Sequence, residues 1–312
     1  TIPETPPAEG EAPTGPGSMT MRLSMTDLAG TTNSTMLPAA DMADMAAALA
    51  KGFASDGSFS SGATTYDLAI TDASGPTTIS GTGESSSFGF GLNAQSMTYA
   101  AGGKGVTMAM TTPTLPFPVN LSYAEAAFNV LMPVGPTEQP ADFALLTKLV
   151  DLKISDEIWA MFDPTAQLPR DPATIVIDAR GTARLNKNIM DPAAMEAAGD
   201  TPPGEIYSLD IREILARFAG AELTGVGAFT FDNSDLVTYG GIPAPTGKID
   251  LKLTGGNGLM DKLVAMGLVP EDQVMGLRMM LSMFANATGE DELSSTLEFK
   301  DGGFFANGQQ LQ

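Results

Sequence analysis

The feature that most constrains the fold is an alternation of apolar and polar residues with a period of two, repeated along most of the chain. Residues 18–26 set the pattern, since one side of this segment carries Met19, Met21, Leu23 and Met25. A period of two puts successive side chains on opposite faces of a strand, so each such segment predicts a half-buried β-strand. Glycine, serine, asparagine and proline separate the segments, which is typical of an antiparallel meander.

Further segments extend this pattern to the end of the chain. The alternation predicts additional strands at residues 64–71, 77–82, 85–92, 94–100, 105–112, 119–132, 173–188, 205–209, 222–233, 246–254 and 292–300. Helical spacing and capping residues predict helices at residues 38–51, 141–152, 155–162, 190–198, 210–219, 258–266 and 270–285. Asn307-Gly308 predicts a closing hairpin. The predicted fold is a β-rich α+β protein, with a large curved antiparallel sheet and several helices packed on one face.

The domain organisation follows from composition. Residues 1–17 are rich in Pro, Gly, Glu and Thr and almost empty of apolar side chains, which predicts a disordered or linker segment. Residues 18–312 are interpreted as one β-rich domain. A loose recurrence of strands followed by a helix pair leaves open a division into two similar halves, about 18–172 and 173–312.

Charge and residue counts exclude several kinds of function. The chain has 37 Asp and Glu against 16 Lys and Arg, a net charge of −21, which repels nucleic acid. It has no cysteine and no histidine, which removes thiolate nucleophiles, the Ser–His–Asp triad and the usual zinc ligands. No apolar run is long enough to cross a bilayer as a helix. A cysteine-free chain is compatible with export to the periplasm and equally compatible with the cytosol.

The remaining polar residues form no recognised catalytic or cofactor motif, so we predict no catalytic residue and no cofactor. Two acids close together, Asp232 and Asp235, are the candidate metal ligands, because hard cations such as calcium prefer several oxygen ligands. Solvated turn acids are the alternative interpretation. Paired carboxylates of this kind also leave open a carboxylate-based hydrolase.

The apolar faces of the strands carry the leading functional hypothesis. Methionine is adaptable, and the chain has 19 of them. An ordinary hydrophobic core is one interpretation, and a groove for a lipid or other hydrophobic ligand is the other. The candidate ligand-binding residues are Met19, Met21, Met108, Met110, Phe88 and Phe90.

The C-terminal run LTGGNGLMDKLVAMGLVPEDQVMGLRMMLSMFA, followed by ELSSTLEFKDGGFFANGQQL, resembles the end of the uncharacterised bacterial domain-of-unknown-function family 2125. The resemblance implies an exported protein of Gram-negative bacteria and carries over no functional residue. The closing hairpin is also similar to that of exported families related to AsmA-like lipid-transport proteins, which by analogy favours a lipid-facing groove.

Together these observations predict a non-catalytic periplasmic or envelope-associated protein that binds a lipid or another hydrophobic ligand. A structural or protein-interaction module, which would dock an envelope protein, is the first alternative. The carboxylate-based hydrolase is the second.

Overall fold

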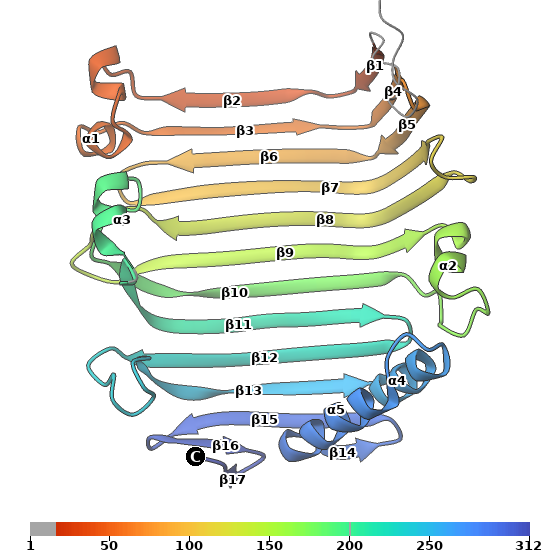
Figure 1. The fold of residues 1–312 in the computed structure, drawn as a ribbon. Coiled ribbons are helices and arrows are strands. Elements are labelled where there is room, and N and C mark those ends of the chain that lie inside the picture. Colours follow the sequence, from red (N-terminus) through yellow and green to blue (C-terminus); the bar gives the residue numbers. More distant parts are fainter. Residues whose placement is uncertain (1–16, 200) are drawn as a thin grey trace, which may run out of the picture.

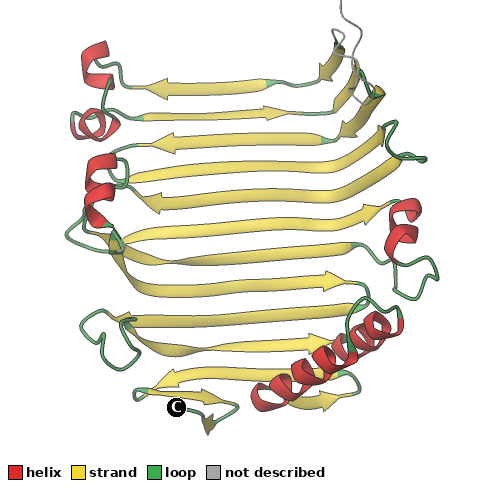
Figure 2. Cartoon of the chain, in the orientation of Figure 1, coloured by secondary structure: helices red, strands yellow, loops and turns green. Residues whose placement is uncertain are grey.

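The computed structural model describes residues 17–199 and 201–312 and contains one antiparallel sheet of 17 strands that is not closed into a barrel (Figures 1 and 2). The predicted fold class, a β-rich α+β protein built on a large antiparallel sheet, is confirmed. The predicted linker at residues 1–17 lies, apart from Gly17, outside the described residues.

The elements follow one another along the chain with short connections, as expected for a meander. The strands are β1 (Ser18–Met25), β2 (Ala29–Ser34), β3 (Ser55–Ser61), β4 (Thr64–Asp72), β5 (Gly75–Gly83), β6 (Ser85–Leu92), β7 (Ser96–Thr111), β8 (Val119–Pro133), β9 (Ala141–Ile154), β10 (Ala173–Leu185), β11 (Gly204–Phe218), β12 (Ala221–Asp232), β13 (Ala244–Thr254), β14 (Asn286–Gly289), β15 (Glu292–Lys300), β16 (Gly303–Ala306) and β17 (Gln309–Gln310). The helices are η1 (Ala39–Met42), α1 (Met45–Ala50), α2 (Asp156–Phe162), α3 (Pro192–Ala198), α4 (Gly256–Ala265) and α5 (Glu271–Phe284).

The first strands of the sheet are long strands broken once in the middle. β5 and β6 are the two parts of one such strand, and both pair with β7. β4 and β3 are the two parts of the next one, in which β4 pairs with β5 and β3 pairs with β6. β1 and β2 form the outermost strand in the same way. From β7 to β13 each strand pairs with the next along the chain, and β15 then pairs with β13, β14 and β16.

The breaks line up across the sheet and produce a bend, which Figure 1 shows where β7 and β8 turn toward their ends near β5. Asp27, Gly105 and Asp151 have φ angles of 50°, 58° and 54° at this line. A positive φ interrupts the extended backbone, and glycine, aspartate and asparagine tolerate it best. We call this row of residues the bend line.

The helices gather at the strand ends, except that α4 and α5 lie in front of β13–β15 (Figure 1). The buried cluster among the described residues is correspondingly small, and it consists of Trp159, Leu168 and Ala219. Phe218 stacks on Trp159 with ring centroids 5.7 Å apart. Partly buried residues of α4 complete the cluster. The centre of the sheet is therefore a single layer, although sheets normally bury one face against a second layer.

Two predicted helices are wrong. Residues 141–152 form most of β9, and residues 210–219 lie almost entirely in β11. Both segments are rich in helix-forming residues, but they pair on both edges with neighbouring strands, and this pairing overrides the local preference. Residues 94–100 and 105–112 were predicted as two strands and form the single strand β7. β9 pairs with β10, so the sheet continues across the predicted boundary between residues 172 and 173. The similarity of the two halves, residues 18–172 and 173–312, stays a prediction.

Candidate ligand-binding face

The two faces of the sheet differ sharply in chemistry. Residues that pair directly across antiparallel strands project to the same face, so the register assigns every strand residue to one of two faces. We call one of them the apolar face, and its members from successive strands include Phe59, Phe88, Tyr99, Phe128, Leu145, Ile177, Ile211, Phe229, Leu251 and Leu297.

The opposite face, which we call the polar face, holds the charges. Eight ion pairs link its side chains, among them Lys148–Glu125 at 2.8 Å and Arg184–Glu205 at 2.7 Å. Hydrogen-bonded hydroxyl pairs also join neighbouring strands on this face, for example Thr82 and Thr107, whose Oγ1 atoms are 2.7 Å apart. The other six ion pairs are Arg180–Asp178, Arg212–Asp210, Arg217–Glu222, Lys248–Asp250, Lys252–Glu292 and Lys300–Glu298.

Four aromatic rings from four neighbouring strands form a ladder on the apolar face. Ring centroids are 6.3 Å apart for Phe59 and Phe88, 5.3 Å for Phe88 and Tyr99, and 6.0 Å for Tyr99 and Phe128. These side chains remain 41, 37, 41 and 44% exposed, in the same order. Rings that pack against one another along a sheet but stay open above present a continuous apolar surface.

The apolar face continues across the bend line because the alternation changes parity there. On β7 the odd-numbered residues Met97 and Tyr99 are apolar before Gly105, and the even-numbered Met108 and Met110 are apolar after it. A Cβ placed on Gly103 would lie 3.8 Å from the Cγ2 atom of Val106, so these two residues point to the same face of the sheet. Even-numbered residues after the bend therefore lie on the same face as odd-numbered residues before it.

A hollow of about 430 Å³ lies at the bend and receives apolar side chains from both of its sides. Phe128 lies before the bend on the apolar face, whereas Met25, Tyr66, Val106 and Tyr123 come from beyond it. Burial and the neighbouring Tyr123 raise the pKa of Tyr66, so its hydroxyl stays neutral. The hollow therefore places the hydroxyl of Tyr66 among apolar side chains, with Lys148 also in its lining.

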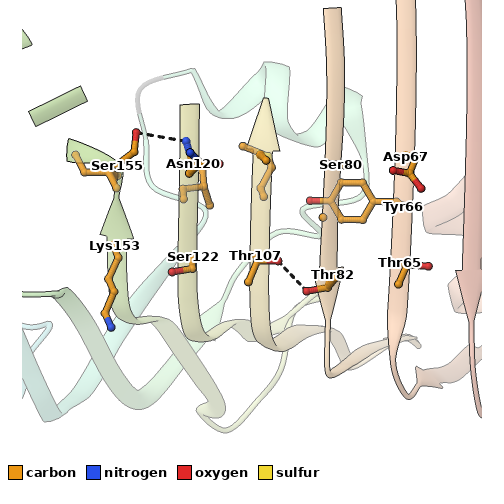
Figure 3. Close-up of a pocket in the computed structure, with 15 residues that line it drawn as sticks. Thr65, Tyr66, Asp67, Ser80, Thr82, Thr107, Asn120, Ser122, Lys153 and Ser155 are labelled. Atoms are coloured by element: carbon orange, nitrogen blue, oxygen red, sulfur yellow. Dashed lines mark hydrogen bonds between the residues drawn. The ribbon is translucent and has the colours of Figure 1, made fainter. Parts of the chain in front are cut away.

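A second hollow, of about 670 Å³, lies beyond the bend line and is lined mainly by polar-face side chains (Figure 3). Figure 3 shows hydroxyl and amide side chains on adjacent strands, with Thr82 bonded to Thr107 and the backbone N–H of Asn120 donating to Ser155. Lys153 lies at one side of it and Asp67 at the other (Figure 3). This hollow shares Tyr66 and Thr82 with the hollow at the bend, and Met108, one of the candidate ligand-binding residues, also lines it.

The acidic residues act as structural acceptors. Asp291 accepts the backbone N–H groups of Asn257 and Gly258, each at 2.8 Å, and so caps the start of α4. Hydrogen bonds from Tyr207 and Arg184 lower the pKa of Glu205. Among the described carboxyls, the groups whose pKa departs from its ordinary value are all shifted downward. A general acid of a hydrolase needs a raised pKa, and these seven shifted carboxyls do not have one.

Asp232 and Asp235, the candidate metal ligands, lie together at the end of β12. Hydrogen bonds from the hydroxyl and N–H of Ser234 lower the pKa of Asp232, and those of Thr238 lower the pKa of Asp235. Within residues 17–199 and 201–312 no three metal-ligating side chains cluster together. The cation site stays a prediction.

The six candidate ligand-binding residues all come to the apolar face, on both sides of the bend. Met19 and Met21 are 71 and 61% exposed on the outermost strand, and Met21 pairs with Leu68. Sequence reasoning missed the contribution of Phe59 to this face, because the serine-rich strand β3 has too few apolar residues to give an alternation. The methionines of α5 at positions 275, 279, 280 and 283 are also exposed.

Residues 53–311 match the model of a family described as uncharacterised protein conserved in bacteria (DUF2125). The chain belongs to this family. The resemblance inferred from the C-terminal sequence is therefore confirmed. The DUF2125 match begins just before β3, so it leaves out β1, β2 and α1. No curated protein and no solved structure gives a significant match. In the described part of the chain, no helix combines the length and hydrophobicity needed to cross a membrane.

Proposed function

We propose that this DUF2125 protein is a non-catalytic binding protein of the bacterial periplasm that holds the acyl chains of a lipid against the apolar face of its sheet. The proposal depends on one observation: the aromatic ladder is partly exposed, and the charged side chains of the strands lie on the opposite face. The absence of cysteine is compatible with an oxidising compartment.

The size of this face exceeds what an isolated folded protein ordinarily leaves open. With strands about 4.8 Å apart and a rise of about 3.3 Å per residue, the whole sheet measures roughly 50 Å by 45 Å. The helices α4 and α5 cover the part of the apolar face at β13–β15 (Figure 1), where Ser295 donates a hydrogen bond to the carbonyl of Phe284. Exposed apolar patches on monomers are usually only a few hundred Å², and larger ones mark interaction sites. One leaflet of a bilayer has a hydrocarbon thickness of about 15 Å, so acyl chains fit on the face in either direction.

The test is lipid uptake from vesicles of phosphatidylcholine, followed by separation and native mass spectrometry. We expect bound phospholipid on the unaltered protein and none on Tyr99→Glu, which puts a charge in the aromatic ladder. The matched control is Thr98→Glu, because Thr98 precedes Tyr99 on β7, is exposed and lies on the polar face. Absence of lipid on the unaltered protein, or equal loss in both variants, would refute the proposal.

A protein-interaction role is the second candidate, and the open edge of the sheet favours it. Every residue of β1 and β2 is exposed, and within the described ranges each of these strands is paired on one edge only. An unpaired edge is a template for a strand from another protein. Crosslinking in cells from a single cysteine at Thr20 would give one reproducible protein partner under this alternative, and protein that carries lipid without a partner under the first.

A further inference from the structure

We propose that the ligand is a lipid whose head group carries no net negative charge, such as the amine-bearing phosphatidylethanolamine, and that anionic lipids are rejected. This inference rests on the proposed function and adds the class of head group. It is carried by the distribution of charge around the apolar face.

The strands themselves contribute little net charge at the apolar face. Charged side chains such as Lys148, Glu125, Arg180 and Asp178 point to the polar face, where they are joined in ion pairs. Acyl chains lying on the apolar face would meet few charged groups from the strands, Lys148 at the hollow of the bend being one of them. The head group of such a lipid has to leave this face at its rim.

The rim is strongly acidic. Outside the strands, the described loops and helices carry 18 acidic side chains and five basic ones, and two of these acids, Asp27 and Glu84, lie at the bend rather than at the rim. Three of the five basic residues already form ion pairs with acids of the same loops and helices: Lys51 with Asp41, Arg170 with Asp156, and Arg278 with Asp261. The basic residues at the rim are Lys51, Arg170, Lys187, Lys262 and Arg278.

A head group at the rim therefore sits within a negative field. Charges separated by less than the Debye length, about 8 Å at physiological ionic strength, interact without full screening. The field disfavours a phosphate without a compensating cation and favours an ammonium group.

The experiment uses vesicles of equal parts phosphatidylethanolamine and phosphatidylglycerol with matched acyl chains. After incubation and separation, the lipids carried by the protein are counted by native mass spectrometry. We expect at least about fivefold more ethanolamine than glycerol lipid at low salt, and a ratio falling toward one in about 1 M salt, where the Debye length shrinks to about 3 Å.

Charge-neutral variants separate the rim from the overall charge. The triple variant Glu138→Gln, Glu157→Gln and Glu196→Gln removes rim carboxylates that have no ion pair in the described residues, and it should lower the ratio severalfold. The matched control makes the same change of charge on the polar face, through Asp67→Asn, Asp142→Asn and Glu213→Gln, and should leave the ratio unchanged.

Each outcome is decisive. Protein that carries both lipids equally, or prefers the anionic one, overturns this inference while the proposed function stands. Protein that takes up neither lipid overturns both. An equal effect of the two triple variants would assign the selectivity to net charge alone and would remove the role of the rim.

Discussion

Removing one ring of the aromatic ladder should weaken ligand binding by a predictable amount. Phe128 is 44% exposed at the end of the ladder. Its side chain has about 200 Å² of surface, so roughly 90 Å² remains for a ligand to cover. At about 25 cal/mol per Å² this corresponds to about 2 kcal/mol, or a roughly 30-fold weaker affinity for Phe128→Ala.

The assay is a titration with diphenylhexatriene, an uncharged probe whose fluorescence rises when it leaves water. Val226→Ala is the control, because Val226 is also apolar and 52% exposed but pairs with Asp250 on the polar face. We expect the affinity to change for Phe128→Ala alone. Fluorescence of the single tryptophan, Trp159, reports whether either variant still folds. Equal affinities of Phe128→Ala and unaltered protein, with both folded, would refute the assignment of the binding surface.

Three further predictions concern the fold. Gly105→Ala should lower the free energy of unfolding, measured with denaturant, by about 1 to 2 kcal/mol, because the φ of 58° at Gly105 disfavours a Cβ. The control is Gly276→Ala in α5, which has open space around it and should not destabilise the protein. Asp291→Ala removes both hydrogen bonds that cap α4 and should cost about 2 kcal/mol in the same assay, with Glu290→Ala as the neighbouring control. The pKa values of Glu125 and Glu205 are lowered in the folded state, so their stabilising effect is complete above the unfolded value of about 4.3 and is lost as the pH falls through the folded values. Thermal unfolding should therefore show a drop in stability below about pH 4.5 that Glu205→Gln reduces, and a stability independent of pH in that range would contradict it.

The alternation predicted most strands of the sheet, and the two wrong helices have an identifiable physical cause. On β11 the register shifts between Ile211 and Ile214, so two apolar residues three positions apart both reach the apolar face. A β-bulge of this kind imitates helical spacing in the sequence. On β9 apolar residues occur on both faces, as Leu145 and Leu146 show, and this hides the period of two.

The extent of the candidate site could not be read from alternation alone. The bend line changes the parity of the pattern, so Met97 and Met108 look as if they belong to opposite faces of β7. Only the positive φ of Gly105, and the proximity of Val106 to Gly103, join the two halves into one surface. The identity of the apolar residues was accessible from the sequence, and their common face required the backbone.

A single-layer sheet of this size has to be stable without a buried core across its centre. The strands supply continuous backbone pairing. On the polar face, ion pairs such as Lys148–Glu125 and Arg184–Glu205 and the hydroxyl pairs join neighbouring strands, and on the apolar face the aromatic ladder adds contacts between strands. Under the proposed function, a ligand that enters or leaves the apolar face would leave the polar-face contacts intact. A conventional two-layer sandwich would have to open its core to do the same, at a cost comparable to unfolding. The segregation of charge to one face would then supply contacts between strands on that face and leave the other face free of strand charges for the proposed lipid.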